Sequence, residues 1–160
     1  MKSRQILILL VALIFPSCIF IFLKIFGKNR FDVQPMFANE VPAISSECSV
    51  DYRLPYQVAD SVLQRIGMGE NRVAYMYFGD EGAERLFARV DERYENDPVT
   101  STRLDPEENS FIRKCIFLLE EPFDVVLVDS NGVIRGQYNS HDRDEIDRLI
   151  TEIAVLIEKY

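Results

Sequence analysis

The chain has 160 residues, 28% of them charged, and a formal net charge of −8 at neutral pH. All 26 Asp and Glu residues follow residue 30, against 13 Lys and Arg there, so residues 31–160 carry a charge of −13. An acidic surface of this kind is repelled by phosphate backbones, which argues against the nucleic-acid-binding class, and no phosphate-cradling glycine loop is present.

Residues 5–23 form an uncharged, apolar run between a short flank at residues 1–4 and basic residues from Lys24 to Arg30. At 1.5 Å per residue a helix of this length spans about 28 Å, close to the roughly 30 Å of bilayer hydrocarbon. Backbone groups in lipid must satisfy one another, so the run predicts one transmembrane helix, with Pro16 tolerated as a kink. The lipid bilayer is the predicted partner of this segment.

A cleavable signal peptide is the alternative interpretation of the same run. Signal peptides have apolar regions of about 7–15 residues that end at a small-x-small site. Here the small pair Ser17–Cys18 is followed by five more apolar residues, which favours an uncleaved single-pass anchor in the inner (cell) membrane. Basic residues on both sides leave the orientation open, whereas the acidic remainder favours the periplasmic or extracytoplasmic side.

Residues 24–56 contain Pro35, Pro42 and Pro55 and show little periodicity, which predicts a juxtamembrane tether. Residues 57–160 then have the length of one small domain, with no internal repeat.

Strand and helix patterns alternate within this domain. The apolar run Val73–Phe78 predicts a buried strand, and Asp80 is a candidate N-cap for the helix that follows. Apolar residues at helical spacing define one face of that helix: Ala83, Leu86, Phe87, Val90 and Tyr94. The breaker sequence 96–98 ends it.

The second half of the domain continues the alternation. A second strand is predicted at Val99–Leu104, and a second helix from Pro106 to about Leu119. Strands at Val125–Val128 and Val133–Tyr138 flank an Asn-Gly hairpin turn. The last helix follows a cap pair, Asp142 and Glu145, and carries this apolar stripe: Ile146, Leu149, Ile150, Ile153 and Ile157.

The predicted order is β-α-β-α-β-β-α. A helical crossover makes the first two strands parallel, and the hairpin makes the last two antiparallel. The expected fold class is therefore α/β, a thioredoxin-like mixed sheet with helices on both faces, preceded by a single N-terminal transmembrane helix.

Three stretches carry a resemblance to a known family. Residues 126–138, VLVDSNGVIRGQY, and 145–150, EIDRLI, resemble the hairpin and final helix of the Sco/SenC family, and 56–60, YQVAD, resembles the start of its domain. Members are membrane-anchored, thioredoxin-like proteins associated with copper delivery to cytochrome c oxidase. The likeness covers roughly residues 50–160 and implies a related scaffold.

This sequence lacks the residues that carry the chemistry of that family. The family uses a C-x-x-x-C motif after the first strand and a histidine before the third, because thiolates and imidazole suit copper. Here the corresponding loop, 79–83, has no cysteine, and Glu120, Glu121 and Pro122 occupy the histidine's place. We expect no catalytic residue, no cofactor-binding residue and no metal ligand.

The remaining cysteines leave three interpretations open. Cys18 lies in the predicted anchor, and Cys48 and Cys115 are 67 positions apart. An oxidising compartment permits a disulfide between the last two, but sequence alone does not show whether their Cα atoms lie within about 7 Å. The pattern favours Cys115 as a small buried hydrophobe, while a redox or copper role is the least favoured interpretation.

Other polar candidates have ordinary structural explanations. His141, the only histidine, is expected in a solvated loop after the fourth strand. Asp80 and Glu81 suit a helix N-terminus for dipole reasons. Pro122 is either a cis proline before the third strand or a trans proline that ends the preceding helix.

The sequence therefore predicts a membrane-anchored, non-catalytic, Sco-like domain that acts by protein binding. The resemblance implies a membrane protein partner, such as a respiratory complex subunit during assembly. The alternative function is a thiol oxidoreductase or copper metallochaperone that uses Cys48 and Cys115 in a non-family arrangement.

Overall fold

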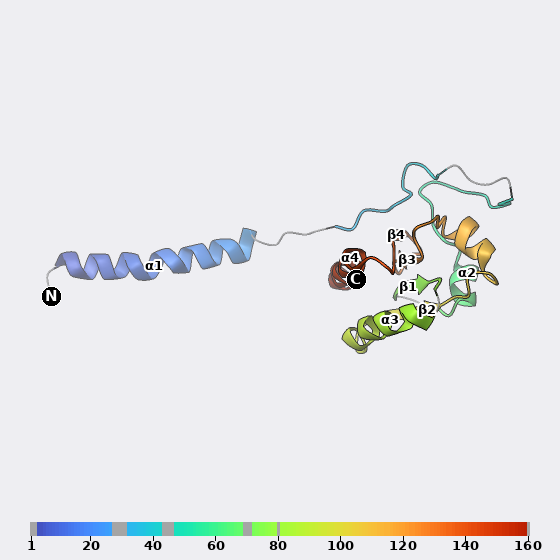
Figure 1. The fold of residues 1–160 in the computed structure, drawn as a ribbon. Coiled ribbons are helices and arrows are strands. Elements are labelled where there is room, and N and C mark those ends of the chain that lie inside the picture. Colours follow the sequence, from blue (N-terminus) through green and yellow to red (C-terminus); the bar gives the residue numbers. More distant parts are fainter. Residues whose placement is uncertain (1–2, 27–31, 43–46, 69–71, 80, 160) are drawn as a thin grey trace. The chain divides into compact units, whose positions relative to one another are not determined.

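The computed structural model describes residues 3–26, 32–42, 47–68, 72–79 and 81–159. The chain divides into two compact units, Met1–Phe31 and Asp32–Tyr160 (Figure 1). Asp80, the predicted N-cap, and the side chains of Glu81 and Leu86 lie outside what is described.

The first unit contains helix α1, Ser3–Phe26, with Pro16 inside it. Its described side chains, Gln5 and residues 12–22, are exposed. Across the described part of the chain, no helix has the length and apolar character needed to cross a membrane. This finding corrects the predicted fold class: the transmembrane helix over residues 5–23 is wrong, and the architecture is a small α/β domain that follows helix α1.

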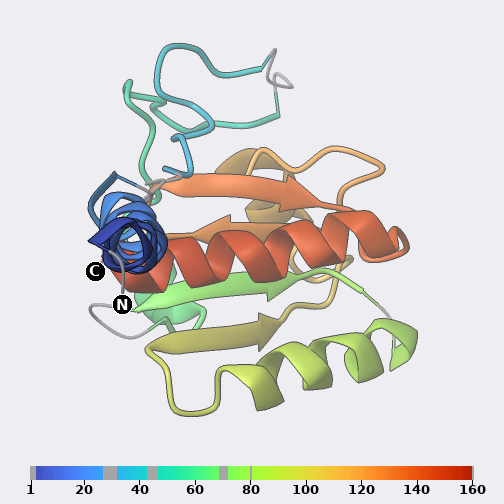
Figure 2. The same ribbon diagram turned by 90° about the vertical axis from the view of Figure 1, so that its left-hand side faces the viewer.

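The second unit is built on a four-stranded mixed sheet in the order β2-β1-β3-β4 (Figure 2). Its strands are β1 (Val73–Tyr77), β2 (Val99–Arg103), β3 (Val125–Val128) and β4 (Ile134–Tyr138). β1 pairs with β2 in parallel, and the β1–β3 and β3–β4 pairs are antiparallel. The mixed sheet predicted from the crossover and the hairpin is confirmed.

One face of the sheet, here called the helix-covered face, packs against α3 (Glu81–Arg93) and α4 (Arg143–Lys159), as Figures 1 and 2 show. Alternate strand residues such as Tyr75, Leu127 and Tyr138 point to this side. They meet the predicted apolar stripes of the two helices, including Phe87 and Leu149, which are almost fully buried.

The opposite side, the loop-covered face, has less regular cover. Strand residues such as Met76 and Val126 pack there against the short helix α2 (Asp60–Arg65), the π-helix η1 (Ile112–Ile116) and residues within 37–41 and 50–58. The sequence predicts a longer regular helix from Pro106 to about Leu119. The structure instead has turns from residue 106 and a wide π-helical turn, in which Phe117 N donates to Ile112 O and Leu119 N to Arg113 O.

The Asn-Gly turn is found as predicted, and a buried ion pair adds to it. Gly132 has φ +77°, and a Cβ there would lie 2.8 Å from Val58 O. The Asp129 carboxylate accepts hydrogen bonds from the N–H groups of Asn131 and Val133, and it pairs with Arg135 at 2.6 Å. Asp129 and Arg135 thus fix the hairpin from inside the domain.

The predicted tether of residues 24–56 differs from the structure beyond Asp32. Met36 N donates to Ile134 O at 3.0 Å, and Arg135 Nη1 donates to Val33 O at 2.7 Å. Val58 N donates to Gly132 O at 2.8 Å. The compact unit therefore starts at Asp32, because the hairpin binds this segment.

Candidate functional site

A pocket of about 370 Å³ opens where β1 ends, at Phe78 and Gly79. β3 runs antiparallel to both β1 and β4. The end of β1, the start of β3 and the end of β4 therefore lie at the same end of the sheet. The lining residues come from these strand ends and from the segments beside them: Phe78, Gly79, Ala83, Pro106, Arg113, Glu121, Pro122, Asp124, Ser140 and His141.

Asp124 and Ser140 form a hydrogen-bonded polar pair in the pocket. Ser140 N donates to Asp124 Oδ1 at 2.7 Å, and Ser140 Oγ donates to Asp124 Oδ2. The backbone of Asp124 is also fixed, because its N–H donates to Tyr138 O and its carbonyl accepts from Phe78 N. The Ser140 hydroxyl therefore serves as a donor to a carboxylate, and the pair holds the ends of β3 and β4 together.

Arg113 supplies the cation of the pocket from η1. Its Nη2 donates to Phe123 O at 3.2 Å, which ties η1 to the loop before β3. Its Nε is buried and has no hydrogen-bond partner among the described residues. The guanidinium is thus positioned by η1 and by the carbonyl of Phe123, which lies between two residues that line the pocket.

The residues singled out from the sequence are only partly in this pocket. His141, predicted as a solvated loop residue, is exposed and lines the rim, and its N–H donates to Asn139 Oδ1. Pro122 lines the wall, and the Glu121–Pro122 bond is cis, which answers the alternative left open for it. Glu120 is not among the lining residues.

Sequence reasoning missed Arg113, Asp124 and Ser140. Each is an ordinary residue in its local context, a polar side chain beside a strand end or in a short helix. The available signal was topological: strand ends that a mixed sheet brings to one edge carry the side chains of a shared recess.

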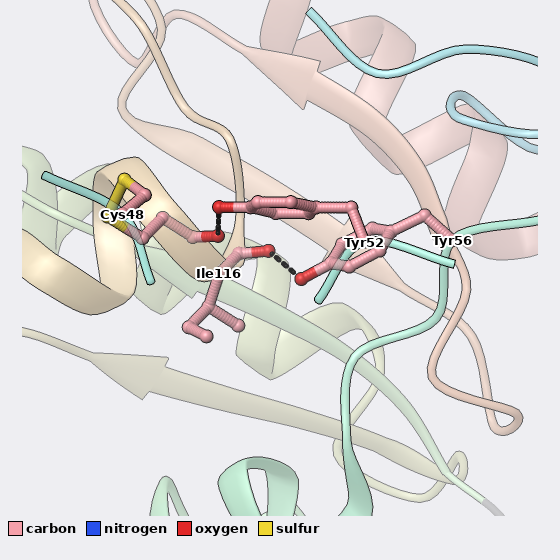
Figure 3. Close-up of a disulfide and its surroundings, with 5 residues drawn as sticks. Cys48, Tyr52, Tyr56 and Ile116 are labelled. Atoms are coloured by element: carbon pink, nitrogen blue, oxygen red, sulfur yellow. Dashed lines mark hydrogen bonds between the residues drawn. A yellow bond between two sulfur atoms is a disulfide. The ribbon is translucent and has the colours of Figure 1, made fainter. Parts of the chain in front are cut away.

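The second feature of interest is a disulfide between Cys48 and Cys115, with Cα atoms 5.4 Å apart (Figure 3). The interpretation of Cys115 as only a small buried hydrophobe is corrected, although the residue is buried. Two tyrosines from the same chain segment reach η1 beside the disulfide. Tyr52 Oη donates to Cys115 O, and Tyr56 Oη donates to Ile116 O, each at 2.7 Å (Figure 3).

Burial shifts the titration of both tyrosines. It raises the pKa of Tyr52, and it raises the pKa of Tyr56 to about 12, with a smaller contribution from the neighbouring Tyr52. The protonated phenol is the form that donates to a carbonyl, so the fold favours the state that makes these two bonds.

No group of three or more His, Cys, Asp or Glu side chains converges as a metal site would, within the part of the chain that the structure describes. Comparisons with protein-family models, with curated proteins and with solved structures found no match. The resemblance to the Sco/SenC family stays a prediction.

Proposed function

We propose that this protein is a non-catalytic, Sco-like binding protein whose α/β domain holds a partner protein at the pocket beyond β1. The observation that carries the proposal is the fixed polar geometry of that pocket. Asp124 accepts two hydrogen bonds from Ser140, and Arg113 donates to Phe123 O, so these polar side chains are held in place within the domain. A preordered surface of this kind saves the entropy that binding would otherwise cost.

The charge of the domain indicates the kind of partner. Residues 31–160 carry −13, and Glu121 stands exposed at the pocket. A basic protein surface would be attracted over a distance of about a Debye length, roughly 8–10 Å, and would dock faster for it. The family resemblance adds a partner class, a subunit of a respiratory complex during assembly.

The Cys48–Cys115 disulfide supports an extracytoplasmic location for the domain. Disulfides persist in oxidising compartments, whereas cytosolic thiols are kept reduced.

A site-specific photo-crosslinker tests the binding proposal. Placed at position 141 on the pocket rim of the full chain in cells, it should capture one basic protein, identified by mass spectrometry. The matched control is the same crosslinker at position 92, an exposed position near the far end of α3. Capture at 141 should fall in an Asp124→Asn background and in raised salt. Equal capture at both positions, or none at 141, would contradict the proposal.

A second candidate function is favoured by one observation: Cys48 and Cys115 do pair. A thiol oxidoreductase or copper metallochaperone would use this pair as its reactive group. Thiol counting across a series of redox buffers tests it, together with Cu(I) titration of the reduced full chain. A disulfide resistant to the glutathione pool, with no stoichiometric sub-micromolar copper site, would remove this candidate.

A further inference from the structure

The segment that carries the disulfide, residues 47–58 and here called the strap, holds the C-terminal end of η1. The last carbonyls of a helix have no partner within it and need donors from elsewhere. Tyr52 and Tyr56 supply donors to the carbonyls of Cys115 and Ile116, and the disulfide joins Cys48 to the same turn. The strap therefore fixes η1 by one covalent bond and two hydrogen bonds.

The same turn continues into the pocket. Arg113 lies two residues before Cys115, and its guanidinium donates to Phe123 O, between the pocket residues Pro122 and Asp124. Directly after η1, the carbonyls of Phe117 and Leu118 accept hydrogen bonds from Gln137 of β4. A continuous set of contacts thus runs from Cys48 through η1 to the loop that carries Pro122 and Asp124.

We propose that the Cys48–Cys115 disulfide is a redox-sensitive lock on the pocket, which keeps Arg113 and the 120–124 loop in their binding arrangement while it is oxidised. This inference rests on the proposed binding function, and it adds a regulator to that site. The reductant is a dithiol, either a small molecule or a dithiol oxidoreductase.

The reduction proceeds by thiol–disulfide exchange. A reductant thiolate attacks Sγ of Cys48, which is partly exposed, whereas Cys115 is 4% exposed. The Cys48–Cys115 bond breaks, a mixed disulfide forms on Cys48, and Cys115 leaves as a thiolate. The second thiol of the reductant then attacks the reductant sulfur that is bonded to Cys48, and Cys48 is released as a thiolate. Two electrons pass to the protein, both cysteines take up protons, and the reductant becomes a disulfide.

Reduction leaves Tyr56 in place more firmly than Tyr52. Tyr56 is 5% exposed and its backbone N–H also donates to Phe37 O, so the second half of the strap stays bound. The first half loses its covalent bond, which is next to the Tyr52–Cys115 contact. We therefore expect η1 to loosen locally while the sheet stays folded.

Hydrogen exchange on the full chain tests the lock. A Cys18→Ser background removes the exposed free thiol, and dithiothreitol serves as the dithiol. Amides in residues 111–124 should exchange about tenfold faster after reduction, while those in 146–157 of α4 should not change. The Tyr52→Phe variant keeps the disulfide and should show a smaller increase confined to residues 111–119. In a Cys48→Ala/Cys115→Ala variant, the exchange rates should be the same with and without dithiothreitol.

The outcomes separate the lock from the binding function. Unchanged exchange in residues 111–124, or an equal increase in α4, would overturn the lock. Crosslinking from position 141 should be repeated in both redox states. Capture should be about tenfold lower after reduction, because the partner would then bind the oxidised protein about tenfold more tightly than the reduced one. Equal capture in both states would overturn the regulation even if exchange rises. No capture in the oxidised state would end the proposed function, and exchange would still decide whether the disulfide controls η1.

Discussion

The two faces of the sheet bury their apolar side chains under different kinds of cover. On the helix-covered face, α3 and α4 satisfy their own backbone groups, so packing there rests mainly on apolar contact. On the loop-covered face, the carbonyls of residues 115–118 accept side-chain donors instead, from Tyr52, Tyr56 and Gln137. Irregular backbone that is buried must find partners, and here those partners are specific residues far away in sequence.

The difference explains where the candidate site lies. On the helix-covered face the individually placed polar contacts, such as Tyr75 Oη to Asp91 Oδ1 and Tyr94 Oη to Ile150 O, join elements within the domain. The irregular cover places single groups, and Arg113 enters the pocket from η1 for this reason. Recognition residues concentrate on such segments when a rigid scaffold positions them.

The largest expected loss of stability comes from removing a core side chain on the helix-covered face. Phe87 is 1% exposed and stacks on Tyr77 with ring centroids 4.2 Å apart. Phe87→Ala should lower the free energy of unfolding by about 3–5 kcal/mol, because it removes the ring and leaves a cavity. Urea unfolding of the full chain measures the loss. The control is Phe111→Ala, at a position 49% exposed, which should cost below about 0.5 kcal/mol. Similar losses for both would mean that Phe87 is not a core residue.

The second effect concerns the covalent bond of the loop-covered face. The Cys48–Cys115 disulfide closes a chain segment of 67 residues, so its reduction should lower the free energy of unfolding by about 4 kcal/mol. Urea unfolding of the Cys18→Ser chain with and without a dithiol measures this. The Cys48→Ala/Cys115→Ala variant should unfold at the same urea concentration in both conditions. A midpoint unaffected by reduction in the parent would mean that the strap needs no covalent bond.

Sequence periodicity predicted the helix-covered face well. The stripe through Phe87 and the stripe through Leu149 both pack as expected, and each strand lies within one residue of its predicted bounds. These features depend on residues close in sequence, which is what a periodic pattern reports. Helix α1 was also predicted as a helix, but apolar length alone led to the membrane span that the described part of the chain does not support.

The loop-covered face and the site were largely beyond such reasoning. Tyr56 bonds to Ile116, and Cys48 to Cys115, across more than 55 residues, and no local pattern encodes those pairings. The strap therefore looked like a tether. Arg113 and Asp124 are unremarkable where they stand in the sequence, and only the fold brings them to one pocket.

A matched pair of substitutions sharpens the comparison between the faces. Tyr56 Oη donates to Ile116 O on the loop-covered face, and Tyr94 Oη donates to Ile150 O on the helix-covered face, both at 2.7 Å. Ile150 lies inside α4, so its carbonyl keeps a helical partner when the phenol is removed. Tyr56→Phe should therefore cost about 1–2 kcal/mol and Tyr94→Phe about 0.5 kcal/mol, measured by urea unfolding. The reverse order would show that the Ile116 carbonyl finds another donor.

The smallest effect appears only in alkali. Burial raises the pKa of Tyr56 to about 12, whereas a tyrosine in the unfolded chain ionises near 10. The folded state holds this proton more tightly, so its stabilising contribution is complete below pH 10 and is lost as the pH rises from about 10 to 12. Burial, reinforced by a hydrogen bond to Asp91, also raises the pKa of Tyr75 on the helix-covered face, so part of the alkaline loss of stability is common to both faces.

The free energy of unfolding, measured from pH 9 to 11.5 in the Cys18→Ser background, should show a shallower decline for Tyr56→Phe than for the parent. Because an ionised Tyr56 would face the carbonyl of Ile116 without a proton to donate, amides of η1 should lose protection before those of α4. Parallel declines in the parent and the variant would show that Tyr56 titrates as it does in the unfolded chain.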